Sequence, residues 1–156
     1  MKRKMVTLTT DGSCLDNGKE GAVGAWAAIL QYKQKKAEYT GAAKGTTNNR
    51  MELMAVIKGL EKLTEPCEVL VITDSAYVCR SLTNMAMYIE NGFKTKCGVP
   101  PKNDDLLKQL LEIEQKGDHI VKFQFIKGHS GHPGNERANF LATAEANAFQ
   151  KLMKGE

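Results

Sequence analysis

The amino-acid sequence predicts an α/β fold, in which a five-stranded mixed sheet (antiparallel strands 1–3, parallel strands 4–5) is flanked by helices. Three strand-like segments follow one another near the N-terminus with short connections, which is typical of an antiparallel meander. An amphipathic helix then leads into a continuous apolar strand, and this strand–helix–strand order predicts a parallel crossover onto the first strand. Together these observations predict one α/β domain spanning residues 1–156, with its core between about residues 5 and 150.

The first three strands are predicted by side-chain alternation and by their boundaries. Residues 4–11 alternate apolar and polar side chains, a pattern of period two, and the segment ends in Asp11. Residues 22–32 and 37–44 form the second and third strands, joined by a basic turn at residues 33–36. The short connections favour antiparallel pairing of all three.

The next helix and strand have the clearest periodicity. Residues 46–63 carry an apolar stripe at helical spacing, formed by Leu53, Val56, Ile57 and Leu60. Glu65-Pro66 ends this helix. Residues 68–74 are a continuous run rich in β-branched residues, which predicts a central strand buried on both faces.

The C-terminal half predicts four more helical segments, a projecting loop and one strand. Ser75 is expected to cap a short helix, and residues 84–103 to form another short helix and the loop, with Met85 and Met87 packed inward. Residues 104–115 are expected to be helical, and residues 120–127 to form the fifth strand. Asn135 is expected to cap a last helix that runs to about Met153, and its alanines would let it lie close to the sheet; they are Ala138, Ala142, Ala144, Ala146 and Ala148.

Composition excludes several classes of protein. No apolar run approaches the roughly 20 residues of a membrane span, and the basic N-terminus lacks the apolar core of a signal peptide, so a cytoplasmic location is expected. The four cysteines form no Cys-x-x-Cys pair, which disfavours a zinc site or disulfide framework. A net charge of +4 permits an acidic partner such as nucleic acid without requiring one. No dimer-forming heptads are visible, so a monomer without an obligate protein partner is expected.

Four residues are predicted to meet at one edge of the sheet. Asp11 and Asp74 end two strands expected to be parallel neighbours, and ligands bind outside the carboxyl ends of such strands. Glu52 is placed in the first turn of the connecting helix, and Asn139 in the first turn of the last helix. Clustered carboxylates need a neutralising cation, and hard oxygen ligands favour Mg²⁺ or Mn²⁺. Two such ions can promote phosphodiester hydrolysis.

Each of these residues also has a purely structural interpretation. Asp11-Gly12-Ser13 is compatible with a turn, Asn49-x-x-Glu52 with a capping box, and Asp74-Ser75 with a helix N-cap. The histidines at 129 and 132 are compatible with loop packing, and Asn139 with an ordinary exposed helix residue. The joint placement of the residues is what favours a site over these alternatives.

Four segments in order resemble the signature blocks of type 1 ribonuclease H: TDGSC at 10–14, TTNNRMELMAVIKGL at 46–60, ITDSAYV at 72–78 and GHSGHPGNERAN at 128–139. The resemblance extends from about residue 5 to 150. It implies cleavage of the RNA strand of an RNA/DNA hybrid, without sequence specificity, leaving 5′-phosphate and 3′-hydroxyl ends. It also implies dependence on Mg²⁺ or Mn²⁺.

The same resemblance assigns roles to individual residues. It implies that Asp11, Glu52 and Asp74 are metal-binding carboxylates, and that His129 is a mobile-loop histidine that assists proton transfer or product release. The matching positions for hybrid binding are Gly12, Ser13, Cys14, Asn17, Asn48 and Asn49, with Lys94 and Lys96 in the projecting segment.

Two positions depart from the family pattern. Asn139 stands where the family has a fourth acidic residue, and a neutral amide attracts a cation less strongly than a carboxylate does. The nearest acid on that helix, Glu136, is one turn away and could act only through water. The projecting segment carries only Lys94, Lys96 and Lys102, which predicts fewer phosphate contacts and a shallow salt dependence.

Three functions follow from these residues. The first is an active, metal-dependent, hybrid-specific endoribonuclease. The second is a hybrid-binding homologue whose turnover Asn139 has weakened or abolished. The third is a related nuclease acting on DNA, such as a transposase or resolvase core, which the second and fourth blocks disfavour.

Overall fold

The computed structural model describes residues 2–155 and contains a five-stranded sheet in the order β3-β2-β1-β4-β5. β1 (Lys4–Leu15) pairs antiparallel with β2 (Val23–Tyr32), which pairs antiparallel with β3 (Lys35–Lys44). On the other side of β1, β4 (Cys67–Thr73) and β5 (Ile120–Phe125) continue the sheet in parallel. The mixed five-stranded sheet and its crossover onto the first strand are confirmed.

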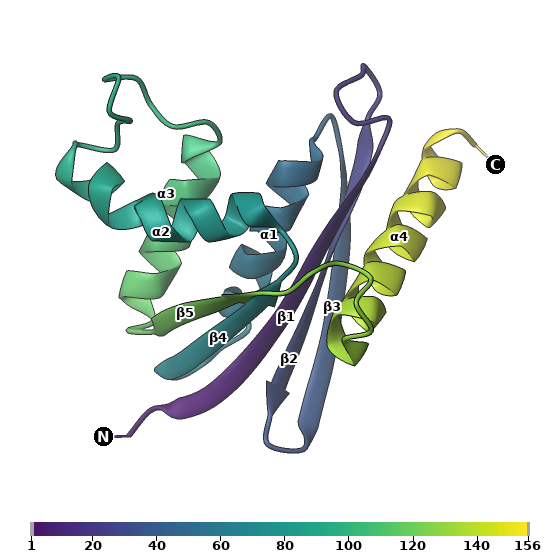
Figure 1. The fold of residues 1–156 in the computed structure, drawn as a ribbon. Helices are drawn as coiled ribbons and strands as arrows, with labels where there is room; N and C mark the ends of the chain where they lie inside the picture. Colours follow the sequence, from purple (N-terminus) through teal and green to yellow (C-terminus); the bar gives the residue numbers. More distant parts are fainter. Residues whose placement is uncertain (1, 156) are drawn as a thin grey trace.

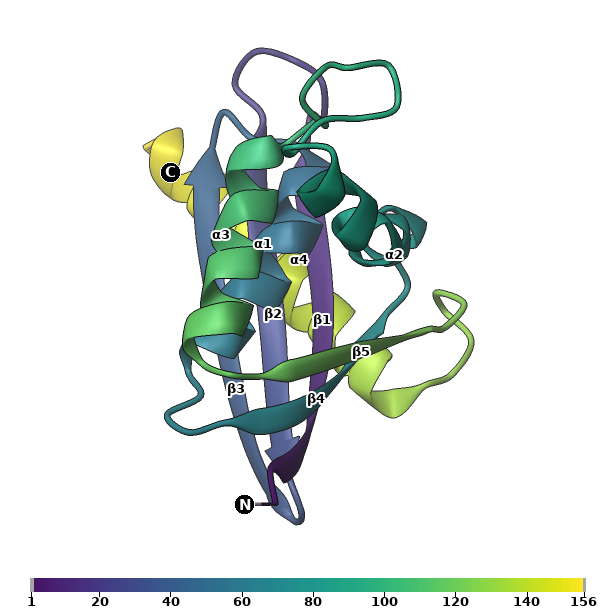
Figure 2. The same cartoon turned by 90° about the vertical axis from the view of Figure 1, so that its left-hand side faces the viewer.

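Helices cover both faces of this sheet in the described part of the chain: α1 (Asn48–Glu61), α2 (Ala76–Glu90), α3 (Asp104–Lys116) and α4 (Pro133–Met153). Figure 1 shows α4 by itself on one side of the sheet, with the other three helices on the opposite side. Figure 2 shows α1 and α3 next to each other over the strands. None of the helices within residues 2–155 is both long and apolar enough to cross a membrane.

The main core lies between the sheet and α1. The predicted stripe of α1 is buried as a unit, since Leu53, Val56 and Ile57 have no exposed surface. It packs against the inward-facing side chains of β1 and β4. A Cβ placed on Gly59 would lie 2.5 Å from a methyl carbon of Leu8, so the helix lies very close to β1.

The start of α1 differs from the expectation. Thr47 is the N-cap, and its hydroxyl accepts a hydrogen bond of 3.2 Å from the backbone N–H of Arg50. The capping-box interpretation of Asn49 and Glu52 is therefore wrong. Because the helix begins at Asn48, Glu52 lies at the start of its second turn rather than in its first.

The α4 face that meets the sheet is narrower than predicted. Ala138, Ala142 and Ala146 recur every four residues and are fully buried, the first two of them in a second small core with Ala27 and Ile29 of β2. The alanines at 144 and 148 are exposed because their helical positions lie on the opposite face. Small side chains still bring α4 close to the sheet, as the sequence predicted.

Two boundaries are corrected by the structure. β1 does not end at Asp11 but continues to Leu15, because residues 12–15 remain paired with β2. Asp11-Gly12-Ser13 is therefore strand, and the turn interpretation is wrong. Residues 76–90 form one helix instead of two short ones. The apolar periodicity of this segment is weak because few of its side chains are buried, among them Val78 and Met85. Met87 is only half-buried.

The fifth strand is shorter and more exposed than expected. It ends at Phe125, two residues before the predicted boundary. Phe123 and Phe125 remain 38% and 52% exposed because β5 is the edge strand of the sheet. The projecting segment is confined to residues 91–103, between α2 and α3.

Candidate active site

Three carboxylates from three elements converge where β1 and β4 separate. The parallel pairing of these strands ends at Thr9 and Ile72, so Asp11 and Asp74 lie just beyond it. Glu52 reaches the same point from α1. One carboxylate oxygen from each of the three lies within 4.8 Å of the others. The structure thus brings together the three acids that the sequence placed at this edge.

The approach of Glu52 depends on a glycine in β1. A Cβ placed on Gly12 would lie 2.6 Å from the backbone nitrogen of Glu52 and 2.8 Å from the carbonyl carbon of Met51. These are backbone atoms of α1, which cannot move aside as a flexible side chain can. Gly12 therefore sets the distance between β1 and α1, and with it the distance between Asp11 and Glu52.

Burial and mutual repulsion raise the pKa values of two carboxylates in the cluster, those of Glu52 and Asp11. Glu52 is only 4% exposed, and burial raises its pKa well above the ordinary value, with the negative charges of Asp11 and Asp74 adding to the shift. Burial also raises the pKa of the Asp11 carboxyl. Oε2 of Glu52 is buried without a hydrogen-bond partner among the described residues. Such an atom is costly unless something else satisfies it.

A divalent cation fits these observations. It would neutralise the mutual repulsion of the three carboxylates and give the unpaired oxygen of Glu52 a partner. The donors are all hard oxygens, the type that Mg²⁺ and Mn²⁺ prefer. Asp11, Glu52 and Asp74 are therefore the residues that could hold such an ion.

Asn139 joins this cluster through Asp11. Its Nδ2 donates a hydrogen bond of 2.9 Å to Oδ2 of Asp11, while the backbone N–H of Gly12 donates one of 3.0 Å to Oδ1. Asn139 lies in the second turn of α4, not the first as predicted, and it is not an ordinary exposed helix residue. Its hydrogen bond opposes the rise in the pKa of Asp11, although burial dominates. Glu136, by contrast, points into solvent.

The loop before α4 also touches the cluster. A Cβ placed on Gly128 would lie 3.0 Å from Oδ2 of Asp74, so the loop backbone runs directly beside this carboxylate. His129 follows immediately, exposed and in the left-handed region with φ of 57°. The loop thus holds a titratable side chain one residue away from the acidic cluster.

His132 has a role that sequence reasoning missed. It is the N-cap of α4, because its Nδ1 accepts a hydrogen bond of 3.0 Å from the backbone N–H of Asn135. The prediction of Asn135 as the cap is wrong for this reason. Pro133 was the available signal, since proline favours the first position of a helix.

The expected hybrid-binding residues lie near one end of the molecule. Oδ1 of Asn17, in the β1–β2 connection, accepts a hydrogen bond of 3.0 Å from the backbone N–H of Asn48. Sγ of Cys14 lies 3.7 Å from the carbonyl oxygen of Thr46. These contacts join the β1–β2 connection to the start of α1, where Asn49 also lies. Gly12 and Ser13 precede them on β1.

Lys94 and Lys96 are on the neighbouring projecting segment. Both side chains are exposed. Figures 1 and 2 show this segment and the β1–β2 connection projecting from the same end of the molecule. Neither lysine contacts the carboxylate cluster in the structure, so the two form a separate basic group beside it.

A polar network at the base of this segment was not predicted. Arg50 donates two hydrogen bonds to the carboxylate of Asp105, of 3.0 and 2.7 Å, and one of 3.2 Å to Oδ1 of Asn103. Nδ2 of Asn103 in turn donates to the hydroxyl of Tyr77. The partners of Arg50 are more than 50 residues away in sequence, so no local pattern could reveal them. The network ties the start of α1 to the end of the projecting segment.

Comparison with known proteins gives a consistent assignment. Residues 3–147 match the family model for RNase H. The chain is 44% identical over 144 residues to the ribonuclease H of Xanthomonas campestris pv. campestris (strain 8004), covering 92% of this chain and 93% of that protein. It is 49% identical over 138 residues to the ribonuclease H of Pseudomonas savastanoi pv. phaseolicola (strain 1448A / Race 6), covering 88% and 89%.

Solved structures share the fold. The crystal structure of LC9-RNase H1, a type 1 RNase H with the type 2 active-site motif, superposes with a TM-score of 0.82 at 28% identity, over 95% of this chain and 74% of that one. The solution structure of the PFV RNase H domain gives a TM-score of 0.72 at 24% identity, over 94% and 97%, which supports the fold alone. With the family model and these relatives covering most of its length, the chain belongs to the ribonuclease H family of enzymes.

Proposed function

We propose that this chain is an endonuclease that hydrolyses the RNA strand of RNA/DNA hybrids, with a divalent cation held by Asp11, Glu52 and Asp74. The observation that carries the proposal is the cluster itself, in which oxygens of the three acids lie within 4.8 Å of one another and Oε2 of Glu52 has no hydrogen-bond partner among the described residues. Family membership supplies the reaction class.

The cofactor is Mg²⁺ or Mn²⁺, and the site is proposed to take two ions. Bound ions of this kind activate water and stabilise the leaving oxygen in phosphodiester hydrolysis, which yields 5′-phosphate and 3′-hydroxyl ends. Asn139 occupies the fourth position. To act as a ligand it must turn its amide oxygen toward the site, because its nitrogen faces Asp11 in the structure.

His129 is proposed to move a proton during the reaction or product release. It is exposed, it lies next to Gly128, and the backbone at Gly128 runs beside Asp74. Histidine changes charge close to neutral pH, which suits this role. The left-handed backbone at His129 belongs to a loop rather than to a helix or strand, and such loops commonly carry catalytic groups.

Hybrid recognition is assigned to the end of the molecule that carries the β1–β2 connection. Cys14, Asn17, Asn48 and Asn49 are proposed to contact the shallow minor groove, where 2′-hydroxyls distinguish RNA from DNA. Because Oδ1 of Asn17 is engaged by the backbone of Asn48, its Nδ2 is the atom available to the substrate. Gly12 and Ser13 lie along the same strand, between these residues and Asp11.

Lys94 and Lys96 are proposed to contact phosphates. Contacts to sugar and phosphate carry no base identity, so cleavage is expected to be independent of sequence. The chain is further proposed to act as a single-domain monomer in the cytoplasm. Size-exclusion chromatography with light scattering checks the monomer, since a dimeric mass would contradict it.

The decisive experiment is cleavage of an end-labelled RNA/DNA hybrid with Mg²⁺, with Mn²⁺ and with EDTA, beside duplex DNA and duplex RNA. The proposal predicts cutting of the RNA strand of the hybrid only, in either metal and not in EDTA. Cutting of duplex DNA would instead support the related DNA nuclease. No product at millimolar Mn²⁺ would sink the proposal.

A second function is favoured by one specific observation, the amide of Asn139 beside Asp11. If this neutral residue weakens the metal site too far, the chain binds hybrids with little or no turnover. That alternative predicts binding without cutting, and cutting restored by Asn139→Asp. An unchanged rate in Asn139→Asp would remove it.

A further inference from the structure

A dense group of basic side chains surrounds the end of the sheet opposite the projecting segment. It combines the start of β1 with the β2–β3 turn and the first two residues of β3, which lie together at the same end of the molecule in Figures 1 and 2. Nζ of Lys4 lies 5.1 Å, and that of Lys33 5.3 Å, from the ring centroid of Tyr32, so the two segments share one surface. We call this surface the terminal basic patch; it consists of Lys2, Arg3, Lys4, Lys33, Lys35 and Lys36.

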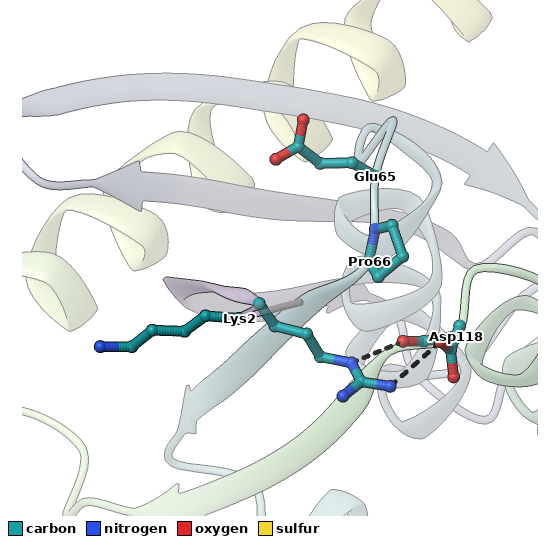
Figure 3. Close-up of a pocket in the computed structure, with 5 residues that line it drawn as sticks. Lys2, Glu65, Pro66 and Asp118 are labelled. Carbon is teal, nitrogen blue, oxygen red and sulfur yellow. Dashed lines mark hydrogen bonds and ion pairs between the residues drawn. The ribbon is translucent and has the colours of Figure 1, made fainter.

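Within residues 2–155, only two of these six charges are neutralised by ion pairs. Arg3 pairs with Asp118 at 3.0 Å, and Lys4 pairs with Glu65 at 3.0 Å. Figure 3 shows the Lys2 side chain pointing away from Asp118. The six basic residues of the patch and their two acidic partners, Asp118 and Glu65, therefore have a net charge of +4. The other 16 basic and 16 acidic residues of the chain cancel, so the whole net charge of +4 resides here.

The patch is continuous with the face of the sheet that carries Asp11. Lys36 pairs with Gln31, and Gln31 pairs with Thr7. Thr7, Thr9 and Asp11 alternate along β1, so their side chains point to the same face. At about 3.3 Å per residue, Thr7 lies roughly 13 Å from Asp11, which is about four nucleotide steps of a duplex.

A groove of about 300 Å³ occupies this interval. Lys36 and Gln31 line it at the end near the patch, and Thr9, His132 and Gly134 line it toward the site. Arg137 forms one wall, where Glu38 holds its guanidinium by two hydrogen bonds of 2.7 and 3.0 Å. The groove is thus lined by hydroxyl, amide and cationic groups, together with the carboxylate of Glu38 and the apolar side chains of Ile29 and Ile72.

We propose that the groove and the terminal basic patch form a second phosphate-binding surface, which holds the nucleic-acid backbone on the side of the active site opposite the Lys94–Lys96 segment. The inference rests on the proposed function, because the occupant is the continuation of the same substrate. A row of cations spaced along a face is what a polyanion recognises, and the affinity it adds is independent of sequence.

The continuity of the groove favours nucleic acid over an anionic membrane. A lipid surface could meet the exposed lysines but could not enter a groove lined by Thr9, a residue only 6% exposed. Thr9 lies two residues before Asp11 on β1, so a nucleic-acid strand bound at the carboxylate cluster would lie close to the groove. The surface also supplies the positive charge that the sparsely basic segment 91–103 lacks.

The test is binding of a fluorescent hybrid of about 24 base pairs, roughly 80 Å long, measured by anisotropy without divalent metal between about 50 and 200 mM salt. The variant Lys33→Gln/Lys35→Gln/Lys36→Gln removes three charges. If each lysine contacts one phosphate, the slope of log K against log salt falls by about 2 to 3. In the metal-dependent assay the same variant is expected to raise KM and leave kcat unchanged.

The control Lys116→Gln/Lys151→Gln/Lys154→Gln removes the same charge from α3 and the C-terminal end of α4. An equal fall in slope in this control, or an unchanged slope in the patch variant, overturns the inference. Binding to anionic vesicles is measured for the same variants. If the patch variant loses binding to the vesicles but not to the hybrid, the inference is also overturned.

If the triple variant does not fold, the double variant Lys35→Gln/Lys36→Gln replaces it, with an expected fall in the slope of about 2. Because binding is measured without metal, a chain that fails to cleave contradicts the proposed function and leaves this test intact.

Discussion

The amide nitrogen of Asn139 lies 2.9 Å from Oδ2 of Asp11 and donates a hydrogen bond to it. A carboxylate at position 139 would instead face Asp11 as a like charge at the same distance. The amide therefore stabilises the cluster when it holds no cation. The cost is a weaker field for a cation, since one of four potential ligands is neutral.

Replacement of Asn139 by Asp is expected to shift this balance. A fourth carboxylate should tighten Mn²⁺ binding by about tenfold or more, roughly 1.4 kcal/mol. It should also lower the melting temperature in EDTA, because repulsion within the cluster increases. Calorimetric titration with Mn²⁺ and thermal unfolding in EDTA measure both effects. Asn139→Ala separates charge from hydrogen bonding, because it removes the donor without adding charge. Tighter Mn²⁺ binding in Asn139→Ala would show that added negative charge is not what strengthens the site.

The pKa shifts predict how stability depends on pH without metal. The folded-state pKa values of Asp11 and Glu52 are raised, so their contribution to stability is fully present below about pH 4 and is lost as pH rises through the folded values. In EDTA, the free energy of unfolding should therefore fall as pH rises above about 4, relative to the Glu52→Gln variant, whose side chain at position 52 cannot ionise. Each unit by which the folded-state pKa exceeds the unfolded-state pKa corresponds to about 1.4 kcal/mol in the free energy of unfolding.

Saturating Mg²⁺ should abolish most of this difference, because the cation offsets the charges that ionisation creates. Urea unfolding of both proteins at pH 4, 5, 6 and 7, each with and without Mg²⁺, gives the comparison. Parallel pH profiles for the two proteins in EDTA would contradict the assigned shifts.

Gly12→Ala is expected to damage both stability and catalysis. The new methyl group would meet the backbone of α1 at Glu52 and Met51, so the helix must move away from β1. Overpacking of this kind costs about 1–3 kcal/mol. The shift also separates Glu52 from Asp11, so kcat should fall more than stability alone explains. Ser13→Ala, the next residue of the same strand, is the matched control and should change the free energy of unfolding by less than about 0.5 kcal/mol.

The sequence predicted the sheet, its crossover and the three acids because these depend on local patterns. The alternation of apolar and polar side chains predicted β1. An apolar stripe at helical spacing predicted α1, and a run of β-branched residues predicted β4. What it could not predict depends on contacts between distant residues. The extension of β1 to Leu15 is decided by pairing with β2. The hydrogen bond from Asn139 to Asp11 joins residues 128 positions apart.

Two of the predicted helix starts were wrong, whereas Ser75 caps α2 as predicted. Thr47 and His132 cap their helices, where Asn49 and Asn135 had the residue type usually found at caps. The N-cap is the residue just before the first residue with helical backbone angles, as the extended backbone of Thr47 and His132 shows. Neighbouring candidates such as Thr47 and Asn49 have similar intrinsic preferences. Sequence alone does not rank them.

The ion pair of Arg50 with Asp105 lies at the base of the projecting segment that carries Lys94 and Lys96. The pair is bidentate, with hydrogen bonds of 3.0 and 2.7 Å, and it raises the pKa of Arg50 and lowers that of Asp105. Lysine cannot reproduce this planar contact. The side chain of Asp105 is 61% exposed, so the pair itself should contribute no more than about 1 kcal/mol.

A double-mutant cycle of Arg50→Lys and Asp105→Asn in urea should give that coupling energy. The pair Lys116–Glu112, one turn apart on α3, is the control and should give a smaller coupling energy, because both of its side chains are exposed. If the network positions the projecting segment, Arg50→Lys should also raise KM for the hybrid severalfold while kcat changes little. Asn103, the second partner of Arg50, ends that segment and binds Tyr77, so a weaker contact at Arg50 loosens the attachment of the two lysines. An unchanged KM together with a normal coupling energy would restrict Arg50 to a purely structural role.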